Sequence, residues 1–139
     1  MHKKIFALVI IDQVTKLIFW SRDFFVGPIH VHSVRNLGLG FGVNFGLLAN
    51  LIIIAAALIY FVYYYFRERG QSGILFHLSF ALVLAGAASN IIDRLYLGYV
   101  RDFLDLGLGF TFNLADAMIV LGLILILFKP KRHEDYLGN

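Results

Sequence analysis

Four aspartates in the second half of the chain could carry chemistry: Asp93, Asp102, Asp105 and Asp116. Two carboxyl groups held close together cannot both ionise readily, so one keeps its proton while the other acts as a base. Such a pair can activate a water molecule and protonate a peptide carbonyl, which is the chemistry of aspartic proteases. Asp102 and Asp105, three residues apart and flanked by apolar side chains, would ordinarily form the solvated face of a short helix. The residues alone do not single out a pair.

Two of these aspartates also fit structural roles at helix ends. Asn113 followed three residues later by Asp116 is typical of a capping box, which satisfies free backbone N–H groups at a helix N-terminus. Asn90 and Asp93 share a helical face, and Arg94 could pair with Asp93 or with a lipid phosphate. A capping carboxylate can still act as a base, because it is rigidly held and aimed outward.

Asp12 and Lys16 are charged residues inside an apolar segment. Their spacing of four places them on one face of a helix, where each can neutralise the other. Charged groups within a membrane are costly, at least about 2.5 kcal/mol each, and usually mark a functional site. A structural ion pair and a direct role in substrate positioning both remain open for them.

Other chemistries have weaker support in this sequence. The chain has no cysteine, which excludes a thiolate nucleophile, a disulfide and a cysteine-ligated metal. His30 and His32 lack an acidic partner nearby in sequence, so a surface strand is favoured over a metal site there. We therefore assign no metal ligands and expect no cofactor.

Composition and hydropathy indicate the elements that must position these residues. Hydrophobic residues make up 60% of the 139 residues and charged residues only 15%, which excludes a typical soluble globular protein. We expect a single integral membrane domain over residues 1–139, mainly α-helical, with four transmembrane helices. These are predicted at about residues 5–22, 46–66, 74–92 and 112–128.

The positions of lysine and arginine predict the orientation of these helices. Seven flank one set of helix ends and four lie in the opposite loops, which places both termini in the cytoplasm. This distribution explains the basic pI without nucleic-acid binding, which we do not expect. The outer loops are then about residues 23–45 and 93–111. Residues 23–45 combine β-branched and aromatic residues with glycines and predict a small β-rich element on the membrane surface, while part of the second loop would lie in the membrane interface.

Carboxylates in membrane helices also mark ion pathways, so a small transporter or proton-conducting protein is the alternative function. A proton relay needs polar groups through the depth of the bilayer. The segment 46–66 has no such group beyond Asn50 near its outer end, which disfavours this alternative.

Four motifs in order resemble one known family over nearly the whole chain. They are Asp12-Gln-Val-Thr-Lys16, Arg35-Asn36-Leu-Gly-Leu-Gly-Phe-Gly42, Asn90-Ile-Ile-Asp93-Arg94 followed by Gly98-Tyr-Val-Arg-Asp102-Phe103, and Phe112-Asn113-Leu-Ala-Asp116. Each motif is weak alone, but the ordered set is similar to the lipoprotein signal peptidase family, also called signal peptidase II.

The resemblance implies an intramembrane aspartic endopeptidase of the bacterial inner membrane, with its active site at the extracytoplasmic face. Such enzymes remove the signal peptide from diacylglyceryl-modified prolipoproteins just before the lipidated cysteine. By motif position the catalytic pair falls on Asp102 and Asp116, and residues 23–45 would form a cradle for the substrate. The implied partners are lipid-modified prolipoproteins, membrane lipids and cyclic peptide inhibitors of the globomycin type. The resemblance gives supporting or substrate-binding roles to Asp12, Lys16, Asn36, Asn90, Asp93, Arg94 and Asn113.

The chain also departs from the family pattern. It is shorter than typical members, and Leu39 and Ser89 stand where smaller residues are usual. These departures concern the surroundings of Asn36 and Asn90, while both expected catalytic positions are filled.

Overall fold

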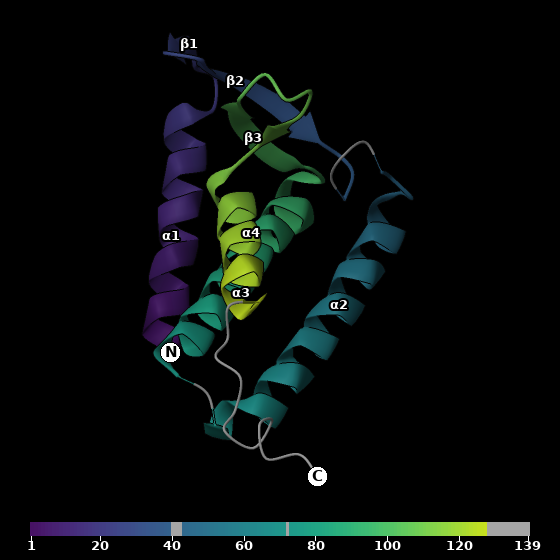
Figure 1. The fold of residues 1–139 in the computed structure, drawn as a ribbon. Helices are drawn as coiled ribbons and strands as arrows, with labels where there is room; N and C mark the ends of the chain where they lie inside the picture. The colour runs from purple at the N-terminus through teal and green to yellow at the C-terminus, as the bar shows by residue number, and fades with distance from the viewer. Residues whose placement is uncertain (40–42, 72, 128–139) are drawn as a thin grey trace.

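The computed structural model describes residues 1–39, 43–71 and 73–127. Four helices stand side by side and a small sheet lies across one end of them, opposite the N-terminus (Figure 1). The helices are α1 (His2–Phe19), α2 (Leu47–Glu68), α3 (Ile74–Leu97) and α4 (Leu114–Leu127), with a short 3-10 helix, η1 (Arg69–Gln71), after α2. The strands are β1 (Asp23–Val26), β2 (Ile29–Asn36), β3 (Val100–Asp105) and β4 (Thr111–Phe112).

The sheet is antiparallel, with the strand order β1-β2-β3-β4. The β-rich element predicted in residues 23–45 is confirmed as the β1–β2 hairpin, which turns at Gly27, where φ is +58°. The second outer loop contributes β3 and β4 to the same sheet. The short helix considered for Asp102 and Asp105 is wrong, because β3 pairs with β2 along this stretch.

A register shift in β2 changes which of its residues share a face with Asp102. Val31 lies opposite Leu104 and Val34 lies opposite Asp102, so β2 advances three residues where β3 advances two. Such an extra residue, as in a β-bulge, reverses the alternation of side chains along a strand. As a result His32 and Asn36, four residues apart, project to opposite sides of the sheet.

Helix α3 is the centre of the helical layer. It packs against α4 along much of its length and also contacts α1 and α2. Glycines permit the close approach of α3 and α4. A Cβ atom at Gly86 would overlap the backbone carbonyl oxygen of Ala115, and one at Gly122 would lie 2.7 Å from that of Ser79. Small residues at such contacts are typical of helices packed in membranes.

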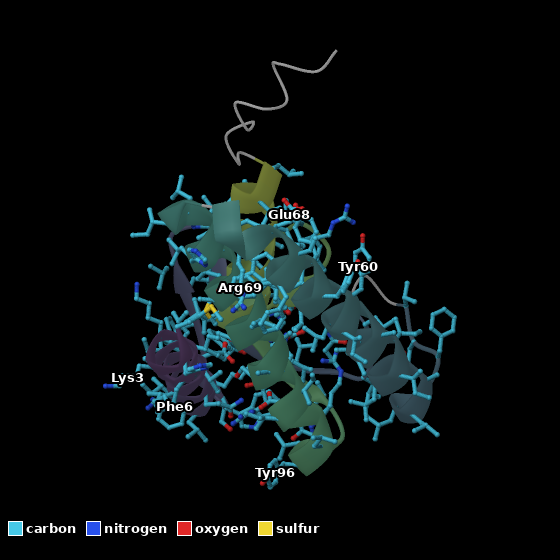
Figure 2. All side chains as sticks on the ribbon, turned by 90° about the horizontal axis from the view of Figure 1, so that it is seen from below. Lys3, Phe6, Tyr60, Glu68, Arg69 and Tyr96 are labelled. Carbon is cyan, nitrogen blue, oxygen red and sulfur yellow. The ribbon has the colours of Figure 1, made fainter. Side chains whose placement is uncertain are left out.

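The interior of this helical layer contains charged and polar side chains as well as apolar ones. Buried polar side chains from α1 and α3 include Asp12, Lys16, Asn90 and Asp93. Apolar side chains point outward, as Phe6 of α1 and Tyr60 of α2 do in Figure 2, and these two are 68% and 70% exposed. A surface of this kind is covered by lipid in a membrane protein.

Two of the four helices, α2 and α3, are long and apolar enough to cross a membrane by length and composition. α1 carries four charged side chains in its 18 residues, and α4 has 14 described residues. The predicted end of the last segment at residue 128, the basic tail after it, and motif residues 40–42 lie outside the described residues.

The third helix extends five residues beyond its predicted end at residue 92. Gly98 ends it in the left-handed conformation, with φ of +81°, and donates its N–H to the Arg94 carbonyl. Glycine adopts this conformation without a Cβ penalty. Asp93 and Arg94 are therefore helical residues rather than loop residues.

Candidate active site

Asp102 and Asp116 approach each other from the sheet and from the first turn of α4, and Asn113 links them. The Asn113 side-chain oxygen accepts the backbone N–H of Asp116 at 2.9 Å, and Asp116 Oδ2 accepts the backbone N–H of Asn113 at 3.2 Å. This is the geometry of a capping box, which confirms that interpretation of the sequence. The Asn113 amide donates in addition to Asp102 Oδ1 at 2.6 Å. The cap therefore also positions the two carboxyl groups.

Two further asparagines complete the surroundings of these carboxyl groups. Asn36 of β2 donates its side-chain amide to Asp102 Oδ2 at 2.9 Å. Asn90 of α3 donates to Asp116 Oδ1 at 2.8 Å and accepts from the Asn113 amide at 3.2 Å. Each carboxyl oxygen of Asp102 and Asp116 thus accepts a hydrogen bond from an asparagine side chain or backbone.

Burial changes the acidity of Asp102, which lies in β3 and is only 1% exposed. Loss of solvation and the nearby charge of Asp116 raise the pKa of Asp102 from its ordinary 3.8 to about 7, although Asn36 and Asn113 act in the opposite direction. One of two adjacent carboxyl groups is therefore suited to hold a proton at neutral pH.

Asp12 and Lys16 form a fully buried ion pair beneath this site. Lys16 Nζ lies 2.9 Å from Asp12 Oδ2 and 3.3 Å from Asp93 Oδ2, and it donates to Asn90 Oδ1 at 2.9 Å. Asp12 accepts the backbone N–H of Ala115 at 2.7 Å, next to Asp116. The pair therefore joins α1 to α3 and α4 and positions Asn90, without contact to Asp102.

Asp93, besides its contact with Lys16, is bound by Arg101 and Gln13, whose roles sequence reasoning missed. Arg101 Nη2 lies 2.7 Å from Asp93 Oδ1, and the Arg101 backbone N–H donates to Asp93 Oδ2. Gln13 donates to Asp93 at 3.0 Å and accepts from Arg101 at 2.6 Å. Since Arg101 immediately precedes Asp102, this cluster fixes the position of β3. Its signal in the sequence was the place of Gln13 and Arg101 inside two of the motifs.

Ser89, one of the departures from the family pattern, is buried and hydrogen bonded. Its hydroxyl donates to Asp12 Oδ2 at 2.5 Å and accepts from Gln13 at 2.9 Å. The larger residue is thus accommodated by polar contacts between α1 and α3.

Arg94 and Asn50 hold the segment that follows β2. Arg94 Nη2 donates to the Gly38 carbonyl at 2.6 Å, and Gly38 donates its N–H to the Asn36 side chain at 2.9 Å. Asn50 of α2 donates to the Leu37 carbonyl at 3.2 Å. Arg94 thus positions Asn36 through the backbone.

Asp105 does not belong to this group. Because β3 is a strand, residues three apart project to opposite faces, and Asp105 contacts His32 instead of the site. Of the four candidate aspartates, the fold brings Asp102 and Asp116 together and gives Asp93 an ion pair with Arg101.

A groove of about 430 Å³ opens beside Asp102. It lies between the end of β2 and the segment before β4, and both polar and apolar groups line it. Its lining includes Asn36, Gly38, Asn44, Asp102, Phe110 and Thr111. The groove is large enough for several residues of an extended peptide.

Comparison with known proteins assigns a family to this arrangement. The model of the family described as Signal peptidase (SPase) II matches residues 4–130. The chain is 34% identical to the lipoprotein signal peptidase of Halothermothrix orenii, over 94% of this chain and 97% of that one. It is 36% identical to the enzyme of Syntrophomonas wolfei, over 91% and 92%, and 33% identical to that of Staphylococcus aureus, over 91% and 90%.

Two solved structures, both described as bacterial membrane enzyme structures determined by the in meso method, have a similar fold. One, at 2.3 Å resolution, matches with a TM-score of 0.77 and 34% identity, over 90% of this chain and 83% of that one. The other, at 1.9 Å resolution, matches with a TM-score of 0.75 and 35% identity, over 90% and 88%. The similarity therefore covers both the helices and the sheet.

Proposed function

Because the chain belongs to the lipoprotein signal peptidase (signal peptidase II) family, membrane enzymes that cleave the signal peptides of lipoproteins, we propose that Asp102 and Asp116 are its catalytic pair. The observation that carries this proposal is that one residue, Asn113, donates its side-chain amide to the Asp102 carboxylate and its backbone N–H to the Asp116 carboxylate. The supporting roles proposed for Asn36 and Asn90 rest on their hydrogen bonds to the same two carboxyl groups.

In the proposed mechanism Asp102 begins protonated and Asp116 ionised, in agreement with the raised pKa of Asp102. Asp116 takes a proton from a water molecule as the water oxygen attacks the scissile carbonyl carbon. Asp102 gives its proton to the carbonyl oxygen, which forms a neutral tetrahedral intermediate. The C–N bond then breaks as the leaving amine takes the proton held by Asp116 and the intermediate returns a hydroxyl proton to Asp102.

The proposed substrate is a diacylglyceryl-modified prolipoprotein, cut just before its lipidated cysteine. The groove beside Asp102 would hold the peptide in an extended form against β2 and the residues around Gly38. The diacylglyceryl chains of the substrate would stay in the bilayer, against the exposed apolar side chains of the helices. Cyclic peptides of the globomycin type would compete for this groove.

For the topology we propose four membrane spans, α1 to α4, with both termini in the cytoplasm and the sheet outside the inner membrane. Because the chain has no native cysteine, single cysteines can report this directly. A cysteine at Leu108 should react with a membrane-impermeant thiol reagent in right-side-out vesicles, and one at Lys4 only in inverted vesicles. Labelling in the reverse orientation would contradict the topology.

Substitution of the two aspartates tests the catalytic assignment. Asp102→Asn and Asp116→Asn should each abolish cleavage of a lipidated precursor in detergent micelles while the protein remains folded. Glu68→Gln, the same acid-to-amide change at the far end of α2, is the matched control and should retain activity. Full activity in either aspartate variant would exclude the proposed pair.

The alternative of a proton-conducting protein makes a separate prediction. It requires pH-driven proton flux in liposomes that depends on Asp12. Asp12 is buried with Lys16, Ser89 and the Ala115 N–H as partners, an arrangement that favours a structural role.

A further inference from the structure

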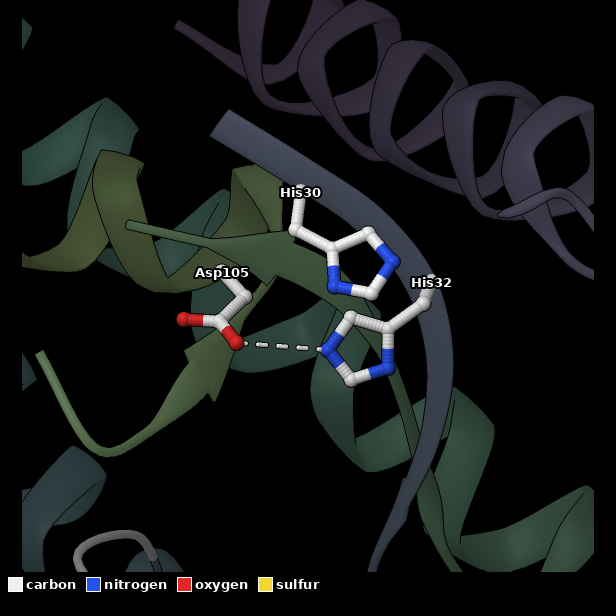
Figure 3. Close-up of side chains that lie close together, drawn as sticks. All are labelled: His30, His32 and Asp105. Carbon is white, nitrogen blue, oxygen red and sulfur yellow. Dashed lines mark hydrogen bonds and ion pairs between the residues drawn. The ribbon is translucent and has the colours of Figure 1, made fainter. Parts of the chain in front are cut away.

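A second cluster of chemically active side chains lies on the sheet, apart from Asp102 and Asp116. It consists of His30 and His32 of β2 and Asp105 of β3, whose nearest ligand atoms all lie within 4.8 Å of one another (Figure 3). The His32 Nε2 and Asp105 Oδ2 atoms are 3.4 Å apart. The two imidazole rings stack, with centroids 4.3 Å apart.

Strand geometry brings these residues together without help from the active site. His30 and His32 are two residues apart and so share a face of β2. Asp105 lies directly opposite His30 in the β2–β3 register. The expectation that these histidines lack an acidic partner is therefore wrong, because Asp105 comes from a strand more than seventy residues later and Asp23 comes from the adjacent strand β1.

A second carboxylate orients His30. Asp23 Oδ1 lies 2.8 Å from His30 Nε2, which leaves the other ring nitrogen, Nδ1, turned toward His32 and Asp105 (Figure 3). A carboxylate on one imidazole nitrogen and a metal on the other is the arrangement found around metal-ligating histidines. It fixes the ring orientation and makes the free nitrogen a better ligand.

We propose that His30, His32 and Asp105 bind one divalent transition-metal ion of the Zn²⁺ type, with Asp23 as the outer partner of His30. Two imidazole nitrogens and one carboxylate oxygen are a ligand set that Zn²⁺ accepts, with a water in the fourth position. Zn–N and Zn–O bonds of about 2.0–2.1 Å place tetrahedral ligand atoms about 3.3 Å apart. Side-chain rotation can close the remaining gap, because the three side chains are 27–29% exposed.

The bound ion would cross-link β2 and β3 at Asp105, three residues from Asp102. It would therefore stabilise the sheet and take no part in peptide hydrolysis. The proposal does not depend on which aspartates are catalytic.

Metal titration of the full chain tests this proposal. The protein is purified in detergent micelles through a tag that contains no histidine, stripped with a chelator and titrated with Zn²⁺ by calorimetry. We expect one Zn²⁺ per chain, and Co²⁺ substituted for it should show the visible absorption of a tetrahedral site. Zn²⁺ should also raise the thermal midpoint of the wild-type protein.

Variants identify the ligands. His30→Ala and His32→Ala should abolish the stoichiometric binding and the thermal shift, and Asp23→Asn should weaken binding about 10- to 100-fold, as for other outer partners. His2→Ala, the same change on an exposed residue of α1, is the control and should bind as the wild type does. Asp23, with a side chain 77% exposed, can be replaced without damage to the core, so its variant remains informative if the histidine variants misfold. Absence of Zn²⁺ binding by the wild type, or unchanged binding by the Asp23 variant or the His30/His32 double variant, would overturn the proposal.

Discussion

Asn113 donates a hydrogen bond of 2.6 Å to Asp102 while its side-chain oxygen caps the helix that carries Asp116. A single amide group thus connects the end of α4 to the sheet. Because both ends of the amide are engaged, rotation of this side chain is prevented. The distance between the two carboxyl groups is consequently set by a helix cap, although the aspartates lie 14 positions apart in the chain.

The two functions of Asn113 can be separated by substitution. Asn113→Ser keeps an oxygen that can cap α4 but removes the amide donor to Asp102, whereas Asn113→Ala removes both. We expect a 10- to 100-fold loss of cleavage rate in Asn113→Ser, since hydrogen bonds to charged groups contribute about 1.5–3 kcal/mol. Asn113→Ala should lose in addition about 1 kcal/mol of stability, the usual contribution of an N-cap. Cleavage assays and thermal denaturation in micelles measure the two effects.

A pH profile distinguishes this positioning role from a purely structural one. The Asn113 hydrogen bond lowers the pKa of Asp102, so its loss should raise that pKa and move the alkaline limb of the profile of Asn113→Ser to higher pH. An unchanged profile and an unchanged cleavage rate in Asn113→Ser, with stability lost only in Asn113→Ala, would show that Asn113 is only a cap.

The raised pKa of Asp102 predicts a pH dependence of both activity and stability. Cleavage should decline above about pH 7, where Asp102 loses the proton that the mechanism requires. The pKa of this carboxyl group is about 7 in the folded protein and 3.8 in the unfolded chain. Between these two pH values only the folded protein holds the proton, so the free energy of unfolding should fall as pH rises from 3.8 to about 7 and stay constant above that. Asp102→Asn, which cannot ionise, should lack this fall. Thermal midpoints of the two proteins between pH 4 and 8 provide the measurement, and parallel curves would contradict the assigned pKa.

The buried ion pair of α1 makes a prediction about stability. Lys16→Met leaves Asp12 buried without its counter-ion, and loss of one partner of a buried pair costs about 3–5 kcal/mol. Asp12→Asn combined with Lys16→Met should recover part of this loss, because asparagine can still accept the Ala115 N–H. Denaturation of the single and double variants in micelles tests the coupling. Equal stability of Lys16→Met and the wild type would show that the pair is dispensable.

Parts of the helical layer and one contact of the candidate site could be predicted from the sequence, for identifiable reasons. Long apolar runs give α2 and α3 within a few residues at most ends, and the spacing of Asn113 and Asp116 indicated the cap. The extension of α3 to Leu97 was missed because residues 93–97 include charged side chains, and the stop signal is Gly98.

The β3 strand was the main structural error. Its sequence, Val-Arg-Asp-Phe-Leu-Asp, does not alternate between polar and apolar residues. The three consecutive residues Arg101, Asp102 and Phe103 are all buried, the first two through ion pairing and hydrogen bonding and the third through packing. Its strand character comes from pairing with β2, a contact between segments about seventy residues apart. The same long-range pairing separates Asp102 from Asp105 and supplies an acidic partner to His32, neither of which local spacing could indicate.

Helices α3 and α4 are in such close contact that one added methyl group between them should displace the active site. Gly86→Ala places a Cβ atom against the carbonyl oxygen of Ala115, a backbone atom that can yield only if α4 moves. Ala115 precedes Asp116, so we expect a large loss of cleavage together with a destabilisation of about 1–3 kcal/mol, typical of overpacking. Gly73→Ala is the matched control, since a Cβ atom there meets no atom within 4 Å, and it should leave activity unchanged. Cleavage assays on both variants test whether this helix contact positions Asp116. Normal activity in Gly86→Ala would show that α4 tolerates displacement, and that the hydrogen bonds of Asn90 and Asn113 are sufficient to position Asp116.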